Sequence, residues 1–204
     1  MIVGIGGKLR HGKDEIADRL VNEHGWVKIG MSDGLADALY TLNPWILLPT
    51  ALGWRNRFTA SVARLFKRPP RPVYVRYQWL ADAAGYVGAK ENKEVRRLLQ
   101  ILGTEIGRKM IDEDVWVDMM VNKVKKAMVG VPGVIVTGVR FPNEIEAISE
   151  TLGGELWWVV RPLAAGDNAA HDSENSVNSV DFDRVIRNDG TLKELYAKVD
   201  DLVS

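Results

Sequence analysis

The sequence predicts an α/β fold in which a five-stranded parallel β-sheet is covered by helices on both faces. Short apolar segments alternate along the chain with longer segments whose apolar residues recur at helical spacing. The short segments are almost continuously apolar, which is typical of parallel strands because both faces of such a sheet are buried. A glycine-rich segment joins the first strand to the first helix, as in βα units that bind phosphate.

The expected strands are Ile2–Ile5, Trp26–Ile29, Val134–Thr137, Leu156–Val160 and Val185–Ile186. The expected helices cover residues 13–23, 33–42, 76–87, 92–110, 114–128, 143–152 and 192–202. Residues 45–76, with prolines, two tryptophans and a basic cluster, predict no regular structure. We interpret this stretch as a flap that closes over a site, and a solvated basic surface is the alternative.

Several residues predict where helices begin and end. Asp33 and Thr191 have side chains that cap a helix N-terminus, so each is expected to begin one. Asn43-Pro44 is expected to stop the helix that Asp33 begins, and Gly153-Gly154 to close the helix before it.

Composition excludes some classes of site. The chain has 204 residues, enough for a single domain, and its 27 basic and 27 acidic residues give a net charge of zero. That balance gives no general reason to expect nucleic-acid or membrane binding. Cysteine is absent, which excludes disulfides and thiolate metal sites and fits a reducing compartment. No segment has 18 consecutive apolar residues, so we expect a soluble, cytoplasmic protein.

The segment from Gly7 to Lys13 has the spacing G-x-x-x-x-G-K of a phosphate-binding loop. Glycines allow backbone N–H groups to turn toward phosphate oxygens, and the helix that follows presents its positive end. Lys13 is placed to reach the β- and γ-phosphates of a nucleotide. The alternative is an ordinary glycine-rich turn with a solvated lysine. The Ser or Thr that usually follows the lysine and binds Mg²⁺ is Asp14 here, so the metal would be held differently, through water.

In a parallel sheet, ligands bind beyond the carboxyl ends of the strands. The glycine-rich loop follows the first expected strand, and four polar residues follow the others. We therefore expect these segments to meet at one edge: the loop, Asp33, Arg140, Arg161 and Asn188.

Beyond the loop, several motifs occur in a fixed order. They are Ser32-Asp33-x-Leu35, Arg96-Arg97-x-x-Gln100-x-Leu102-Gly103-Thr104-Glu105-x-Gly107-Arg108, Trp116-Val117, Val139-Arg140-Phe141-Pro142-Asn143-Glu144, Val160-Arg161-Pro162, His171-x-Ser173-Glu174 and Ile186-x-Asn188-Asp189-Gly190-Thr191. Together with G-x-x-x-x-G-K-D, this series resembles the phage-type deoxynucleoside monophosphate kinases. The resemblance covers most of the chain except residues 45–75.

The resemblance implies a three-layer P-loop kinase fold with strand order 2-3-1-4-5. It implies one domain over residues 1–204, with an acceptor-binding insertion at about 33–110 and a lid at about 162–181. The implied activity is transfer of the γ-phosphoryl group of ATP, with Mg²⁺, to a deoxynucleoside monophosphate. It implies a small-molecule substrate, no nucleic-acid or membrane partner and a cytoplasmic location (the host's, if phage-encoded), and it allows a homodimer.

The resemblance also implies roles for individual residues. Those expected to hold ATP are Gly7, Arg10, His11, Gly12, Lys13, Asp14, Glu15, Asn188 and Gly190. Those expected to act in phosphoryl transfer are Lys13, Arg140 and Arg161. Those expected to bind the acceptor are Asp33, Arg96, Arg97, Gln100, Thr104, Arg108 and Arg140.

Each of these roles has a plainer alternative. Arg96 and Arg97 each share a helix face with Gln100, which suits a phosphate and a base edge but also describes a solvated face. Arg140 could bridge two phosphates or pair with Glu144.

The remaining expectations concern the metal, the lid and the turn before the last helix. Gly138 stands where the family often has an acidic metal contact, so the metal ligands stay unknown. Arg161 could begin a lid or an ordinary surface loop. Asn188 could contribute backbone to an adenine site, a tight turn before the last helix, or both.

Two other functions remain open from the sequence. One is another small-molecule kinase of the same fold, similar to dephospho-coenzyme-A kinase or phosphomevalonate kinase. The other is a nucleotide-binding protein without a phosphoryl acceptor, which the departures at Asp14 and Gly138 keep open.

Overall fold

The computed structural model describes residues 1–48, 72–162 and 177–203. The chain forms two compact units. The first contains residues 1–34 and 114–204, and the second contains residues 35–113. No helix among the described residues is long and apolar enough to cross a membrane.

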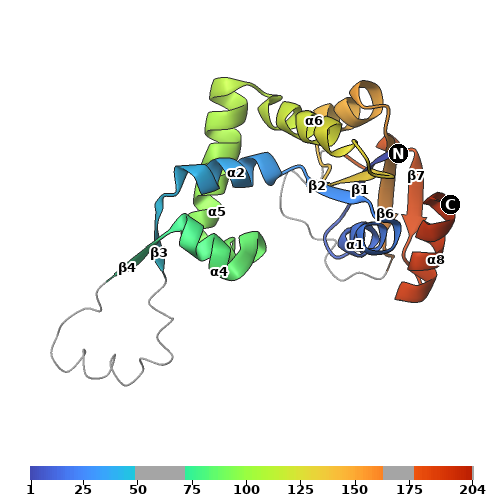
Figure 1. Ribbon diagram of the computed structural model, residues 1–204, viewed down its shortest axis with the longest axis horizontal. Helices are drawn as coiled ribbons and strands as arrows, with labels where there is room; N and C mark the ends of the chain where they lie inside the picture. The colour runs from blue at the N-terminus through green and yellow to red at the C-terminus, as the bar shows by residue number, and fades with distance from the viewer. Residues whose placement is uncertain (49–71, 163–176, 204) are drawn as a thin grey trace, which may run out of the picture. The chain divides into compact units, whose positions relative to one another are not determined.

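The first unit is built on a five-stranded sheet in which all neighbouring strands are parallel. Its strands are β1 (Ile2–Gly7), β2 (Val27–Gly30), β5 (Val134–Thr137), β6 (Glu155–Val160) and β7 (Arg184–Arg187). Figure 1 labels β1, β2, β6 and β7 of this sheet. The order of the five strands is β2-β5-β1-β6-β7. These numbers differ from the 2-3-1-4-5 expected above, because two strands that the sequence did not predict, β3 and β4, lie between β2 and β5 in the chain.

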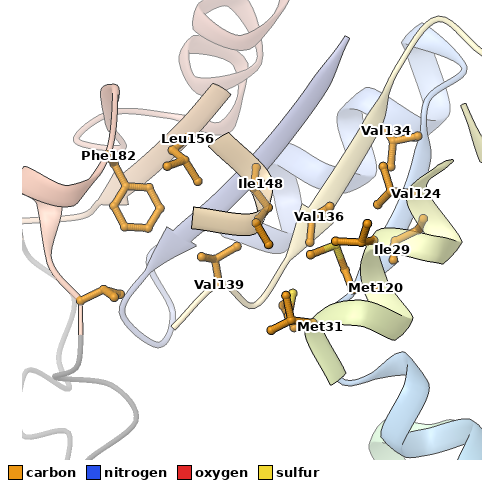
Figure 2. Close-up of a cluster of buried hydrophobic side chains, with 14 of the residues drawn as sticks. Ile29, Met31, Met120, Val124, Val134, Val136, Val139, Ile148, Leu156 and Phe182 are labelled. Carbon is orange, nitrogen blue, oxygen red and sulfur yellow. The ribbon is translucent and has the colours of Figure 1, made fainter. Parts of the chain in front are cut away.

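Side chains of these strands alternate between two separate cores, one on each face of the sheet. On β6, Trp157 packs with α1 (Lys13–His24) and α8 (Leu192–Val203), while Trp158 packs on the other face. The second face is covered by α6 (Val115–Ala127), α7 (Pro142–Glu146) and its continuation η3 (Ala147–Thr151). Figure 2 shows this second core, where Val134 and Val136 of β5 meet Met120 and Val124 of α6. This burial on both faces explains why the strands are apolar throughout.

The ends of the helices correct one expectation and confirm two. The carboxylate of Asp33 accepts a hydrogen bond from the backbone N–H of Gly30, at 2.9 Å, so it ties the turn before the helix instead of capping it. Thr191 does cap α8, because its hydroxyl accepts from the N–H of Glu194 while the Glu194 carboxylate accepts from the N–H of Thr191. Gly153, with a φ of 61°, closes the helix before it.

The second unit contains α2 (Asp33–Leu42, whose first two residues belong to the first unit), β3 (Trp45–Leu48), β4 (Val73–Arg76), α4 (Tyr77–Ala89), α5 (Lys93–Gln100) and η2 (Ile101–Ile111). Its core contains Leu39, Ile46, Tyr77, Ala89, Val95 and Leu99.

The prediction that residues 45–76 lack regular structure is wrong at both ends, where β3 and β4 form an antiparallel pair. Ile46 is fully buried in the core of this unit, which explains why this short strand is stable. Arg76, one of the basic residues of this stretch, donates to the carbonyl of Asn43 at 3.0 Å and lies over the Trp45 ring at 4.4 Å. Residues 49–71, including Arg71 and most of the expected flap, lie outside the described residues.

The single helix expected over 92–110 is two helices of different kinds. Asn92 caps α5 by accepting from the N–H groups of Glu94 and Val95. After Gln100 the chain continues as the π-helix η2, which ends with a bond from the N–H of Asp112 to the carbonyl of Gly107. Gly103 and Gly107 lower the α-helical propensity of this segment. A similar change divides the expected helix 143–152 into α7 and η3.

Candidate nucleotide-binding site

The parallel sheet brings five predicted segments to the same edge of the first unit. The loop of residues 7–13 follows β1, and single predicted residues follow the other four strands: Asp33 after β2, Arg140 after β5, Arg161 after β6 and Asn188 after β7. Since the strands are parallel, all five segments lie at the carboxyl edge, where open α/β sheets bind their ligands.

The loop after β1 has the backbone of an anion-binding turn. Gly7, Arg10 and Gly12 have φ angles of 137°, 64° and 99°, all in the region that ordinary residues avoid. Successive turns of this kind direct backbone N–H groups to one side, which forms a concave site for anions. Helix α1 begins at Lys13, and the residue before it, Gly12, has no side chain to cap it. The first N–H groups of α1 are therefore placed to bind an anion.

Lys13 lies folded against this loop. Its ammonium donates to the carbonyl oxygens of Gly7 at 2.6 Å and Lys8 at 2.5 Å. The side chain is half-buried, so it is not the freely solvated lysine of the plainer interpretation. The positive charge of Lys13 is therefore already placed at the loop, where a bound anion would be attracted to it.

Two buried polar residues hold the loop from behind. His11 is 5% exposed, and its Nδ1 lies 3.1 Å from the carbonyl oxygen of Val159 on β6. A carbonyl only accepts hydrogen bonds, so Nδ1 carries the proton. Asn188 is 3% exposed and donates from its side-chain Nδ2 to the carbonyl of His11 at 3.0 Å. Its backbone N–H donates to the carbonyl of Val160 at 2.8 Å.

This packing explains the glycine at position 12. A Cβ atom on Gly12 would lie 2.5 Å from Nδ2 of Asn188, closer than two such atoms approach. The positive φ disfavours any other residue as well. Glycine at position 12 is therefore required both by the backbone turn and by the buried Asn188 side chain beside it.

The two acidic residues that open α1 face different partners. Asp14 is exposed, and its carboxylate lies 3.5 Å from the ammonium of Lys28 on β2. Burial opposes the charge of Lys28, but its hydrogen bond to Asp18 and the charges of Asp18 and Asp14 outweigh burial and raise its pKa. Glu15 accepts a hydrogen bond from the hydroxyl of Tyr196 on α8 at 3.1 Å.

The segment after β5 holds Arg140 through its backbone. The buried carboxylate of Glu144 accepts from the N–H groups of Arg140 at 2.7 Å and Phe141 at 3.2 Å. Within the described residues, these backbone bonds are what joins Arg140 to Glu144, and the exposed guanidinium forms no ion pair. Gly138, two residues earlier, has a φ of 83°, a conformation in which an aspartate would be strained.

Arg161 is exposed directly after β6, and Gly190 is exposed in the turn before α8. Most of the expected lid, residues 163–176 with His171, lies outside the described residues. The last part of the expected lid contains Val177, which is buried in the core, and the short helix η5 (Ser179–Asp181).

The predicted acceptor residues lie on α5 and η2 of the second unit. Arg96 and Gln100 are exposed on α5, while Val95 and Leu99 of the same helix are buried. Arg97 donates two hydrogen bonds to Glu94, at 2.9 and 2.6 Å, and this pairing raises the pKa of Arg97. Its ion pair supports the helix surface.

On η2, Thr104 is exposed and Arg108 is half-buried. Glu105 pairs with Lys109 at 3.0 Å, a contact that the sequence analysis did not anticipate.

Comparison with known proteins identifies the family. The family of deoxynucleotide monophosphate kinases matches residues 39–199, which is most of the chain. The chain belongs to this family. Among its relatives, the deoxynucleotide monophosphate kinase of Enterobacteria phage T4 is 31% identical over 62% of this chain and 51% of its own length.

Other viral relatives share the same name. The deoxynucleoside-5'-monophosphate kinase of Escherichia phage T5 is 28% identical over 74% of this chain and 72% of its own length. A putative deoxynucleotide monophosphate kinase of Acanthamoeba polyphaga mimivirus is 30% identical over 59% of this chain and 71% of its own length. The chain thus spans about half the length of the phage T4 protein and more of the other two. Dephospho-CoA kinase from Campylobacter jejuni is weakly similar in structure, with a TM-score of 0.45 and 13% identity over 99% of this chain and 95% of that chain.

Sequence reasoning missed one residue role in this deoxynucleotide monophosphate kinase family member. Asn188 was expected to offer its backbone to adenine, and its side chain was not considered. In the structure that side chain is buried against the loop of residues 7–13. The available signal was an asparagine at the end of a strand in a β-α turn, which is also typical of an ordinary turn.

Proposed function

We propose that this chain transfers the γ-phosphoryl group of ATP to a deoxynucleoside monophosphate, on a P-loop kinase fold. The observation that carries this proposal is the loop of residues 7–13, with its positive φ angles and the Lys13 ammonium held inside it. Such a loop binds the phosphates of a nucleoside triphosphate. Membership of the deoxynucleotide monophosphate kinase family supports the choice of acceptor.

In this proposal Lys13 leaves the carbonyl groups of Gly7 and Lys8 and contacts the β- and γ-phosphates. The backbone N–H groups of the loop hold the phosphate oxygens. Arg140 follows β5 and Arg161 follows β6, the two strands that flank β1. In this proposal both neutralise charge that spreads over the γ-phosphoryl group as it moves. Phosphoryl transfer needs positioning and charge neutralisation more than covalent chemistry, and these residue types supply both.

The acceptor site in this proposal is formed by α5 and η2. The exposed side chains of Arg96 and Gln100 share one face of α5, which suits an acceptor phosphate and the edge of a base. Thr104 and Arg108 follow on η2, and Arg97 contributes after exchanging its partner Glu94 for phosphate. In the first unit, Asp33 is held at the end of β2 by the N–H of Gly30, and its proposed contact with the acceptor is a separate part of this proposal.

The described residues are compatible with Mg²⁺ that is bound mainly by the nucleotide. They contain no group of three or more acidic or histidine residues that could hold a metal by itself. Mg²⁺ commonly keeps several waters and binds phosphates together with one or two carboxylates. Asp14, at the start of α1, is one exposed carboxylate beside the loop and would contact the ion through water. The ion would neutralise charge on the phosphates.

The test is formation of ADP from ATP and Mg²⁺ in the presence of single acceptors. The acceptors are dGMP, dTMP, dCMP and dAMP, with dephospho-coenzyme A as a comparison. We expect ADP and the matching deoxynucleoside diphosphate in equal amounts with at least one monophosphate. Turnover with dephospho-coenzyme A alone would assign the chain to the other small-molecule kinase class. ATP binding without turnover of any acceptor would favour a non-catalytic nucleotide-binding protein.

A further inference from the structure

A single buried amide joins two segments that are far apart in the chain and adjacent in the first unit. Asn188, after β7, donates from Nδ2 to the carbonyl of His11 in the phosphate-binding loop at 3.0 Å. Its own backbone N–H is bound to the carbonyl of Val160 on β6. His11 is held by Val159, the residue before Val160 on β6, because its Nδ1 lies 3.1 Å from the Val159 carbonyl. The peptide between His11 and Gly12 is thus anchored on the last residues of β6.

The anchor determines which way this peptide faces. In a trans peptide the C=O and N–H groups point in opposite directions, and no cis peptide is present among the described residues. Because the His11 carbonyl points to Asn188, the N–H of Gly12 points away from Asn188. That N–H belongs to the turn of positive φ angles that ends where α1 begins.

Space around the peptide allows little freedom. Gly12 has no Cβ, and one would collide with the Asn188 amide. Both His11 and Asn188 are almost fully buried. Water therefore has poor access to the His11 carbonyl, and a lost amide donor would not be replaced without movement of the loop. The Asn188 side chain is likewise too buried to contact a base from solvent.

We propose that Asn188 is a positioning residue whose side chain holds the His11–Gly12 peptide in the orientation that lets the Gly12 N–H donate to a nucleotide phosphate. This inference rests on the proposed function of the loop. It gives Asn188 a role that differs from backbone contact with adenine. It also implies that the turn before α8 supports the phosphate end of the nucleotide.

The test compares Asn188→Ala with a control asparagine that also bridges two backbone segments. Asn92 in the second unit caps α5 with its Oδ1 and donates from Nδ2 to the carbonyl of Leu47 at 3.0 Å. Asn92→Ala should lower thermal stability to a similar degree without touching the loop. Inorganic tripolyphosphate is the probe, because it engages a phosphate site and has no base. Binding is measured by calorimetry on the full chain, below the unfolding temperature of either variant.

We expect the Kd for tripolyphosphate to rise about tenfold in Asn188→Ala, the effect of one misplaced charge-assisted hydrogen bond, and to change less than twofold in Asn92→Ala. The amide resonance of Gly12 should shift on adding tripolyphosphate to the wild type and should shift much less in Asn188→Ala. The KM for ATP should rise in Asn188→Ala while the KM for the monophosphate stays constant. Should Asn188→Ala not fold, Asn188→Ser, whose shorter hydroxyl is a poorer donor, is measured in the same way.

Unchanged tripolyphosphate binding in Asn188→Ala would overturn the inference and leave the proposed function intact. Equal weakening in both variants would overturn it too, because lost stability would then explain the effect. A wild type that binds neither tripolyphosphate nor ATP would overturn the proposed function itself, and the inference with it.

Discussion

Arg19 on α1 donates two hydrogen bonds to Asp200 on α8, at 3.1 Å from Nε and 2.8 Å from Nη2. His24, at the end of α1, lies 2.8 Å from the same carboxylate. Since α1 begins at the loop of residues 7–13, this cluster fixes the helix that carries Lys13 against the C-terminal helix. The cluster should make a pH-dependent contribution to stability.

The hydrogen bond from Arg19, followed by that from His24, lowers the pKa of Asp200 from its ordinary value of 3.8 to about 2. A carboxylate with a lowered pKa in the folded state stabilises the protein at pH values above its unfolded pKa. That contribution disappears as the pH falls through the folded pKa. We therefore expect Asp200→Asn to lower the free energy of unfolding by about 1 kcal/mol near neutral pH, as for a partly exposed bidentate pair.

The measurement is urea unfolding of wild type and Asp200→Asn at several pH values. The difference between them should be full above pH 4 and should shrink toward zero as the pH approaches 2, the range set by the shift of Asp200. A difference that stays constant over this range would show that the aspartate stabilises the helices through packing and not through its charge.

Lys13→Ala tests the phosphate-binding loop. Removing the ammonium from Gly7 and Lys8 takes away one phosphate-clamping charge, which typically costs about 3–4 kcal/mol in the transition state. We expect kcat to fall at least a hundredfold while the unfolding temperature changes little, since the ammonium donates to carbonyl groups of the loop itself. Retention of more than a tenth of wild-type kcat would contradict the assignment of this loop.

Features that depend on neighbouring residues could be predicted from the sequence, whereas contacts between residues far apart in the chain could not. The loop at Gly7–Lys13, the five strands of the sheet and the Thr191 cap were predictable because each depends on neighbouring residues. The bond between Asn188 and His11 was not, because it joins positions 177 residues apart and leaves no periodic pattern.

Local patterns also failed where tertiary packing determined the outcome. The β3–β4 pair was missed because prolines in the surrounding stretch suggested irregular structure, and the burial of Ile46 was not visible in so short a segment. Asp33 resembled a helix cap by sequence, but its carboxylate accepts a hydrogen bond from the backbone N–H of Gly30, three residues earlier. The change from α5 to the π-helix η2 has no clear sequence signal beyond Gly103 and Gly107.

Arg140→Ala tests transition-state stabilisation. The Arg140 guanidinium is exposed, and Glu144 binds the backbone of this residue, so the substitution should leave the fold intact. We expect kcat to fall more than the KM for ATP rises, because the charge contact should strengthen as the phosphoryl group moves. The matched control is Arg184→Ala, an exposed arginine at the opposite end of the sheet that pairs with Glu155. Normal kcat with a lowered unfolding temperature in Arg140→Ala would assign this residue a structural role.

Gln100→Leu tests the acceptor site on α5. Gln100 is exposed on the same face as Arg96, whereas an amide that reads a base edge must become buried when the base binds. Leucine removes both the donor and the acceptor of the amide, which leaves polar groups of the base unpaired at a cost of about 1–3 kcal/mol. We expect the KM for the preferred monophosphate to rise about tenfold or more, its advantage over other bases to shrink, and the KM for ATP to stay constant. Lys93→Ala, at the exposed start of the same helix, is the control and should leave all three quantities unchanged. An equal loss of activity with every base would instead show that Gln100 supports the packing of α5.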